Sequence, residues 1–212
     1  MTNLASFLKE TAERFQSAGI ESYQADAEQL IAHHLETSRG ELISRTFLSE
    51  EFTPSDDLLH DIARRENREP LQHLTGVAYF RHLTLSVGPG VFVPRPETES
   101  VVEIGLAFLT EKPGARSLDI GTGSGAIAIA LATESNAQVD AIEKSPEAFS
   151  YAERNILANN AQVNLMAGDF RELPLEFGAY DLVISNPPYI PLSAIPIYPE
   201  VRDHDPDIAI YA

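Results

Sequence analysis

Residues 117–133 read SLDIGTGSGAIAIALAT, and this stretch decides the fold. Its first part, residues 117–120, is a short run of the kind that forms a strand buried between two layers of helices. Glycines then occupy positions 121, 123 and 125, where the backbone can turn tightly and a ligand can approach it closely. Residues 124–133 are rich in alanine, isoleucine and leucine and predict a helix.

The same alternation of strand and helix continues along the chain. We expect further strands at residues 138–142, 163–166 and 181–185, and a further helix at 146–159. An earlier helix should begin near Pro96 and end near residue 109, with Glu97 and Glu99 in its first turn, where acidic side chains complement the helix dipole. Alternation of this kind predicts right-handed βαβ units and a mostly parallel sheet, which is the α/β class.

The glycine turn also predicts a ligand. A helix N-terminus that follows such a turn presents backbone N–H groups to an anion. Glu143 ends the second strand, about 20 residues on, where a carboxylate can accept hydrogen bonds from both hydroxyls of a ribose. Gly121, Gly123 and Ala126 fit the dinucleotide fingerprint as well, so a nicotinamide cofactor stays open at this point, as does a purely structural turn.

The last predicted strand runs into residues 181–189, DLVISNPPY. Two successive prolines cannot donate backbone hydrogen bonds, and each biases its predecessor to extended geometry. The chain should therefore leave the sheet as a stiff corner that carries the Asn186 amide, unused carbonyls and the Tyr189 ring. Such a corner suits a planar amide or amine, although a loop that merely stops strand pairing is the plainer interpretation.

Composition limits the class of protein. The 212 residues suffice for one or two domains, and 43% hydrophobic with 22% charged residues is ordinary for a globular protein. No cysteine is present, so disulfides and thiolate metal sites are excluded and a reducing compartment, the cytoplasm, is expected. The formal net charge of −17 argues against a nucleic-acid partner. No apolar run approaches the ~18 residues of a membrane span, and we see no signal peptide.

The first part of the chain has a different pattern. Apolar residues at helical spacing predict helices at 4–18, 22–36 and 41–47, and a fourth that opens at Thr53-Pro54. We therefore expect a small all-helical domain over residues 1–75. Residues 77–93 should form a β-hairpin whose turn is Gly88-Pro89-Gly90, within a linker over residues 76–95. His33 and His34 are adjacent and face different directions, so we expect no metal site.

The form Asp-x-Gly-x-Gly-x-Gly at 119–125 resembles the first motif of S-adenosylmethionine-dependent methyltransferases. Together with Glu143 and Asn-Pro-Pro-Tyr, it resembles the methyltransferases that act on amino and amide nitrogens. Residues 68–76, REPLQHLTG, and 92–99, FVPRPETE, narrow the likeness to the protein glutamine methyltransferases of peptide-chain release factors, the HemK/PrmC family. The resemblance covers nearly the whole chain, and several of these motifs are specific to that family.

The resemblance implies a Rossmann-like methyltransferase sheet over residues 96–212, preceded by the helical domain as a docking surface for release factors. It implies transfer of a methyl group from S-adenosylmethionine to the glutamine of the Gly-Gly-Gln motif in class-I release factors. The implied catalytic residues are Asn186, Pro187 and Tyr189, and Pro188 joins them in binding the substrate. The implied cofactor-binding residues are Gly121, Thr122, Gly123, Ser124, Gly125, Glu143, Asp169, Phe170 and Asn186.

At the third strand end, Asp169 would bind the adenine amino group and Phe170 would stack on the ring, where the family more usually has a tryptophan. Asp169 could equally be a helix cap. We expect a monomer that binds no nucleic acid directly.

Three other functions compete with this one: a ribosomal-protein glutamine methyltransferase, an adenine-N6 or guanine-N2 nucleic-acid methyltransferase, and a methyltransferase-like module that only binds. A nicotinamide dehydrogenase would leave Asn-Pro-Pro-Tyr unexplained. Methyltransferase sheets of this kind have seven strands and only four are predicted, so we expect the natural protein to continue beyond residue 212 and the fourth strand to be an uncovered edge.

Overall fold

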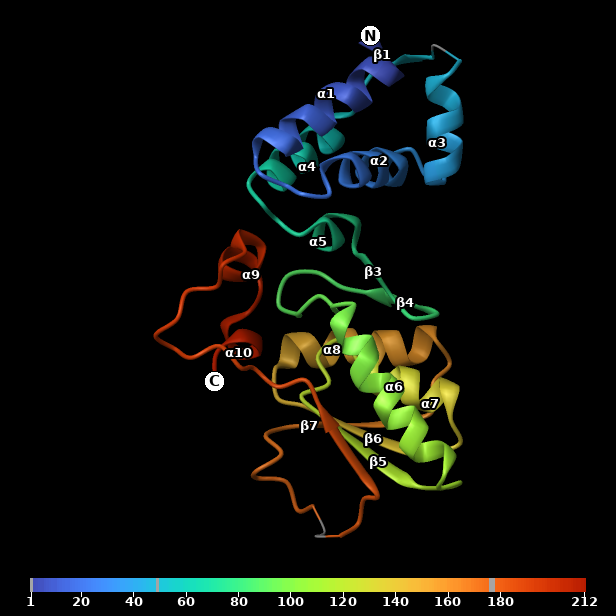
Figure 1. Cartoon of the computed structure of the whole chain (residues 1–212), viewed down its shortest axis with the longest axis vertical. Helices are drawn as coiled ribbons and strands as arrows, with labels where there is room; N and C mark the ends of the chain where they lie inside the picture. The colour runs from blue at the N-terminus through green and yellow to red at the C-terminus, as the bar shows by residue number, and fades with distance from the viewer. Residues whose placement is uncertain (1, 49, 176–177) are drawn as a thin grey trace. The chain divides into compact units, whose positions relative to one another are not determined.

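A computed structural model of the chain describes residues 2–48, 50–175 and 178–212 (Figure 1). Its residues fall into two compact units, Met1–Thr75 and Gly76–Ala212, and each unit has a hydrophobic core of its own. The two units are described separately below.

The first unit is helical. Its core is made by residues such as Leu4, Phe15 and Leu30, which are fully buried. The helices are α1 (Leu4–Ser17), α2 (Tyr23–His34), α3 (Arg39–Thr46), α4 (Asp56–Glu66) and α5 (Leu71–Thr75). The four predicted helices are present, but α4 begins later than predicted, because the Ser55 hydroxyl caps it by accepting a hydrogen bond from the Leu58 N–H (3.2 Å).

Two features of this unit were not predicted. One is α5, which is too short for helical periodicity to reveal. The other is a two-residue antiparallel pairing of β1 (Thr2–Asn3) with β2 (Glu51–Phe52), which ties the start of α1 to the segment before α4. His33 and His34, at which no metal site was expected, lie on α2, and His34 Nε2 lies 3.0 Å from Asp61 Oδ2.

The second unit begins with a hairpin whose turn lies elsewhere than predicted. Strands β3 (Val77–Phe80) and β4 (Leu83–Ser86) pair antiparallel, so the turn is Arg81-His82, and residues 88–90 lie beyond the hairpin. A turn does form at residues 88–91, where the Val91 N–H donates to the Gly88 carbonyl (3.2 Å), but the prediction that it joins the two strands of the hairpin was wrong. Phe80, Leu83 and Leu85 are buried in the core of this unit.

Interactions from outside the hairpin account for this turn. Arg81 has a φ of +53°, which a non-glycine residue adopts at a cost. Its backbone N–H donates to Glu99 Oε1 (2.9 Å), and its guanidinium donates two hydrogen bonds to Glu134 (2.6 and 2.7 Å). These tertiary bonds stabilise a turn that carries no glycine, asparagine or proline, the residues by which a turn is recognised in a sequence.

The main sheet has four parallel strands in the order β7-β6-β5-β8. They are β5 (Arg116–Ile120), β6 (Gln138–Glu143), β7 (Val163–Ala167) and β8 (Leu182–Ser185). Helix α6 (Glu97–Thr110) precedes β5, α7 (Ala126–Glu134) joins β5 to β6, and α8 (Pro146–Ala158) joins β6 to β7. The predicted α/β class and parallel sheet are confirmed. Residues 126–131 of α7 are all buried, which explains their continuous apolar sequence.

The strand order positions the site. The chain moves outward from β5 through β6 to β7, then returns so that β8 pairs with the other side of β5, with Ile120 opposite Ser185. Ligands bind at such a switch point, beyond the carboxyl ends of the strands. After β8 the chain forms α9 (Pro199–His204) and α10 (Asp207–Ile210), neither of which was predicted. In the described part of the chain β8 pairs only with β5.

Candidate active site

A cavity of about 330 Å³ lies at the carboxyl ends of β5, β6, β7 and β8. It brings together eleven of the twelve residues predicted for the site. These are Gly121, Thr122, Gly123, Ser124, Glu143, Asp169, Phe170, Asn186, Pro187, Pro188 and Tyr189. The β5 loop and the Asn-Pro-Pro-Tyr corner meet there because their strands are neighbours, although more than 60 residues separate them in sequence.

The glycine loop leaves room for a ligand. Gly121 and Gly123 have φ values of +70° and +60°, and a Cβ built on either would have no atom within 4 Å. The N–H groups of Gly121 and Thr122 both donate to the Ile142 carbonyl (2.9 and 3.0 Å), which fixes the loop against β6. The loop therefore offers a rigid, open surface that a flat or extended ligand can approach closely.

Gly125 has a different role, because it does not line the cavity. It precedes α7 with a φ of +87°, and a Cβ there would lie 3.0 Å from Ile129 Cδ1 and 3.5 Å from the Ala152 Cα. Gly125 thus lets α7 and α8 pack closely, and the structure does not bring this predicted cofactor residue to the cavity wall.

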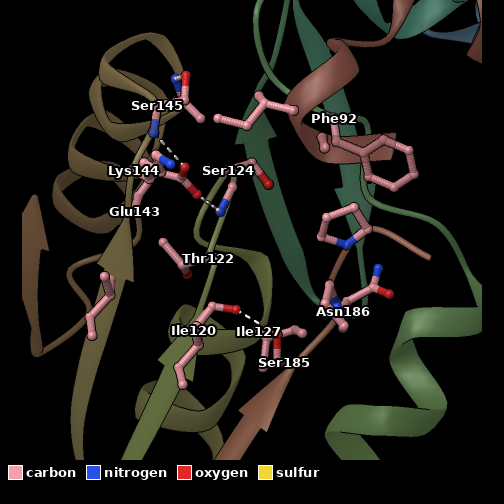
Figure 2. Close-up of a pocket in the computed structure, with 18 of the residues that line it drawn as sticks. Phe92, Ile120, Thr122, Ser124, Ile127, Glu143, Lys144, Ser145, Ser185 and Asn186 are labelled. Atoms are coloured by element: carbon pink, nitrogen blue, oxygen red, sulfur yellow. Dashed lines mark hydrogen bonds between the residues drawn. The ribbon is translucent and has the colours of Figure 1, made fainter. Parts of the chain in front are cut away.

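Glu143 is held by backbone groups on both sides (Figure 2). Its Oε2 accepts a hydrogen bond from the Gly123 N–H (2.7 Å) and its Oε1 accepts one from the Ser145 N–H (2.8 Å). The carboxylate is buried and fixed in orientation, and each oxygen keeps a second lone pair. This geometry suits an acceptor for two adjacent hydroxyl groups.

Asp119 lies beneath the glycine loop and is fully buried. Burial raises the pKa of its carboxyl group from 3.8 to about 7, while the hydrogen bond that the Thr122 hydroxyl donates to Oδ2 (2.6 Å) opposes this rise. The nearby Glu143 carboxylate adds to the increase. A buried carboxyl group therefore supports the loop from below, through Thr122.

Asp169 is the most strongly bonded acid of the site. It accepts hydrogen bonds from the side chain of Arg171, from the Arg171 backbone N–H (3.1 Å) and from Lys144 Nζ (3.2 Å). The Arg171 guanidinium, its N–H and Lys144 hold the pKa of this carboxyl group far below its usual range. Phe170 beside it is 44% exposed. No helix begins at Asp169 in the described residues, which disfavours the capping role.

The Asn186 side chain is oriented by α6. Its Nδ2 lies 3.4 Å from Thr98 Oγ1, a long hydrogen bond that leaves Asn186 Oδ1 as a free acceptor. The preceding Ser185 hydroxyl donates to the Ile120 carbonyl (2.7 Å), which fixes the corner to β5 (Figure 2). Tyr189 is 75% exposed at the cavity, so its ring is available to a substrate.

The sequence motif at 92–99 connects the parts of this unit. Arg95 forms an ion pair with Asp205 (2.9 Å) and lies over the Phe92 ring (5.0 Å), Thr98 bonds Asn186, and Glu99 accepts from the hairpin turn. Phe92 and Thr98 also line the cavity. From the sequence, Glu99 was expected only to complement the helix dipole, and no role was predicted for Phe92, Arg95 or Thr98.

The remaining lining residues were not among those predicted for the site, although Ala126 was noted as part of the dinucleotide fingerprint. They are Gly90, Pro94, Ile120, Ala126, Ile127, Ile142, Lys144, Ser145, Ala148, Gly168, Arg171, Ser185, Pro206, Ile208 and Ala209. Lys144 and Ser145 directly follow Glu143, and Ser185 directly precedes Asn186, so adjacency to a predicted residue could have identified them. No local signal distinguishes residues 206–209.

Comparison with known proteins gives the class. Residues 82–194, more than half of the chain, match the methyltransferase small domain family, and residues 6–76 match the PrmC N-terminal domain. The chain is an S-adenosylmethionine-dependent methyltransferase. The open glycine cradle and the fixed Glu143 carboxylate fit a nucleoside ligand of this kind.

Curated relatives narrow the family. The chain is 44% identical over its whole length to the release factor glutamine methyltransferase of Streptomyces coelicolor, and covers 75% of that protein. The enzymes of the same name from Mycolicibacterium smegmatis and Bifidobacterium longum are 43% and 38% identical over 100% and 98% of this chain, which covers 74% and 76% of theirs. The chain belongs to the release factor glutamine methyltransferase family.

Solved structures match about half of the chain. A tRNA (uracil-54, C5)-methyltransferase from Pyrococcus abyssi is 22% identical over 53% of this chain and 27% of its own, with a TM-score of 0.45. TYW2 from M. jannaschii, in complex with AdoMet, is 23% identical over 50% of this chain and 48% of its own, with a TM-score of 0.44.

Among the described residues, no helix has the length and apolar character needed to cross a membrane.

Proposed function

We propose that this protein transfers a methyl group from S-adenosylmethionine to the side-chain amide nitrogen of the glutamine in the Gly-Gly-Gln motif of class-I release factors. The observation that carries the proposal is the meeting of two loops in one cavity: the cradle of Gly121 and Gly123, and the Asn-Pro-Pro-Tyr corner. The relatives named for this reaction share the whole length of the chain.

Three groups would hold the cofactor. The open backbone at 121–124 would face its methionine part, the two oxygens of Glu143 would accept from the ribose hydroxyls, and the region of Asp169 and Phe170 would hold the adenine. The bonds that fix Glu143 to backbone N–H groups support its role, because an acceptor fixed in advance loses little conformational freedom on binding. When bound, the cofactor supplies an electrophilic methyl group on sulfonium sulfur.

The chemistry needs orientation more than a strong base. An amide nitrogen is a weak nucleophile because its lone pair is delocalised into the carbonyl. Asn186 Oδ1 and the Pro187 carbonyl would accept the two N–H bonds of the substrate amide, which turns the nitrogen toward the methyl group. The nitrogen–carbon bond would form as the sulfur–carbon bond breaks, with the electron pair left on sulfur, and the nitrogen would release its proton to solvent after the transfer.

Exclusion of water would come from Tyr189, whose ring would pack on the plane of the amide. Positioning of this kind accounts for up to ~7–11 kcal/mol in well-oriented reactions. Thr98 supports the arrangement, because its contact with Asn186 Nδ2 leaves the oxygen of that amide available.

The partner is a protein. The first unit, which matches the PrmC N-terminal domain, would serve as the docking surface for the release factor. A net charge of −17 disfavours nucleic acid as the substrate and is consistent with a protein partner. We further propose that the enzyme acts as a monomer in the cytoplasm, where an absence of cysteine is ordinary.

The experiment that tests this function offers three acceptors separately with labelled S-adenosylmethionine: a class-I release factor, total ribosomal protein and DNA. We expect label on the release factor alone. Label on ribosomal protein or DNA without label on the release factor would overturn the proposal and favour one of the other amino-methyltransferase functions, which share the Asn-Pro-Pro-Tyr chemistry.

A further inference from the structure

Residues 190–212 form a strap that returns to the cavity after the Asn-Pro-Pro-Tyr corner. Pro206, Ile208 and Ala209 of the strap line the cavity, as do Phe92 and Pro94 of the segment that precedes α6. The strap is closed on itself, since the Ile190 N–H donates to the Ile210 carbonyl (3.1 Å) and the Ala212 N–H donates to the Ile190 carbonyl (3.0 Å). Those bonds fix its shape but do not attach it to the 92–99 segment.

An ion pair makes that attachment. Arg95 donates from its guanidinium to Asp205 Oδ2 at 2.9 Å. The Asp205 side chain is fully buried and that of Arg95 is one-third exposed. Arg95 also lies over the Phe92 ring at 5.0 Å, so one side chain contacts both the strap and a residue that lines the cavity.

The surroundings of Asp205 give this pair its importance. Its Oδ1 is buried and has no hydrogen-bond partner among the described residues, so Arg95 bonds the other oxygen of an otherwise poorly solvated group. Burial raises the pKa of the Asp205 carboxyl group to about 6, and Glu200 adds to this rise, while Arg95 and His204 oppose it. A buried carboxylate that loses its cation is strongly disfavoured, and such a loss should displace the strap.

We propose that the Arg95–Asp205 ion pair is a positioning device for the substrate. The pair holds residues 206–209 next to the segment that contains Phe92. These two segments then form one wall of the cavity, so that the substrate side chain enters in one orientation. This inference rests on the proposed function, because it assigns the pair to the entry of the glutamine and not to the binding of the cofactor, whose cradle lies on β5 and β6.

The test compares Arg95→Gln, Asp205→Asn and the exchanged pair Arg95→Asp/Asp205→Arg in the complete protein. The readouts are KM and kcat for the release factor, the Kd of S-adenosylmethionine, and hydrogen exchange of the amides of residues 199–210. In the single variants we expect KM to rise about tenfold or more, faster exchange in the strap, and a cofactor Kd within about twofold of wild type. In the double variant with the exchanged pair, we expect KM to return at least part of the way to the wild-type value.

Arg202→Gln is the matched control, because Arg202 pairs with Asp203 on the same strap but both side chains are exposed to solvent, by 46% and 44%. It should change neither KM nor exchange. If the double variant does not fold because the reversed pair is buried, Arg95→Lys is used in its place. We then expect its KM to stay close to that of wild type.

Two results would overturn the inference: an unchanged KM in both single variants, or a rise in cofactor Kd that matches the rise in KM. Neither bears on the proposed function, which fails only if the wild-type protein does not methylate the release factor. Hydrogen exchange of the strap needs no turnover, so the anchoring of the strap can be tested even in that case.

Discussion

At the scale of single residues, the proposed mechanism rests on Asn186. Removal of its amide in Asn186→Ala would take away one of the two proposed acceptors for the substrate N–H groups and leave the cofactor cradle intact. We expect kcat to fall about 100-fold or more, because misplacement of a reacting group by about 1 Å has that effect. Equilibrium binding of S-adenosylmethionine should persist.

The control for this variant is Asn136→Ala, a change of the same size at an exposed residue outside the cavity lining. Turnover of Asn186→Ala near that of wild type would contradict the mechanism. Loss of cofactor binding together with turnover would instead mean that Asn186 serves the cofactor, as the sequence-based prediction also allowed.

Asp119 predicts a dependence of stability on pH. Its pKa is about 7 in the folded protein and near 3.8 in the unfolded chain, so between these values the folded protein holds the extra proton. Raising the pH through this window therefore destabilises the fold, and the effect is complete above about pH 7. In Asp119→Asn this contribution is absent.

The measurement is urea unfolding of both proteins at pH values from about 5 to about 8. Relative to wild type, Asp119→Asn should gain free energy of unfolding as the pH rises, by at most about 1.4 kcal/mol per pH unit. An equal pH dependence in both proteins would show that Asp119 is ionised throughout, and the argument from burial would be wrong.

At the scale of elements, the glycines of the β5–α7 loop differ in role. Gly121→Ala adds a methyl group in open space at the cavity, and Gly125→Ala adds one 3.0 Å from Ile129 Cδ1. Both carry the strain of a positive φ, about 1–2 kcal/mol. We expect Gly121→Ala to weaken cofactor binding and to lose only the free energy of unfolding that the strain accounts for. Gly125→Ala should lose more, because its new methyl group also contacts Ile129.

Gly114→Ala is the control for strain, since Gly114 has a φ of +77°, open space around its Cβ position and a place outside the cavity lining. Thermal unfolding and cofactor titration of the three variants separate the two effects. Equal cofactor affinity in Gly121→Ala and Gly114→Ala would contradict the cradle.

Elements with local causes could be predicted from the sequence. The strands of the parallel sheet were expected to within about one residue, because buried apolar runs bounded by glycine and proline are strong local signals. The hairpin turn at Arg81-His82 was not, because it depends on Glu99 and Glu134, distant in sequence. The short helices α9 and α10 span six and four residues, too few for periodicity to show.

The residues of the candidate site also divide into those with a local sequence signal and those without one. Residues in recognisable motifs, such as Glu143 and Asn186, were predicted to share one site, since the carboxyl ends of parallel strands meet at one edge. The strap residues Pro206, Ile208 and Ala209 were not, since only the return of the chain brings them to the cavity. Gly125 fits the motif, but its surroundings give it a packing role.

At the scale of the whole molecule, the chain joins a helical unit and a methyltransferase unit, and the proposed division of labour is docking by the first and chemistry by the second. A small catalytic cavity can select a glutamine side chain but cannot by itself identify a release factor. The family named for that substrate contains both parts, which supports the assignment of partner recognition to surfaces beyond the cavity.

The measurement that tests the central claim most directly is mass mapping of a class-I release factor after methylation by the complete protein. We expect one added methyl group, on the side-chain nitrogen of the glutamine in Gly-Gly-Gln, and none when that glutamine is replaced by alanine. A methyl group on any other residue, or an unmodified release factor beside labelled DNA, would contradict the proposed function.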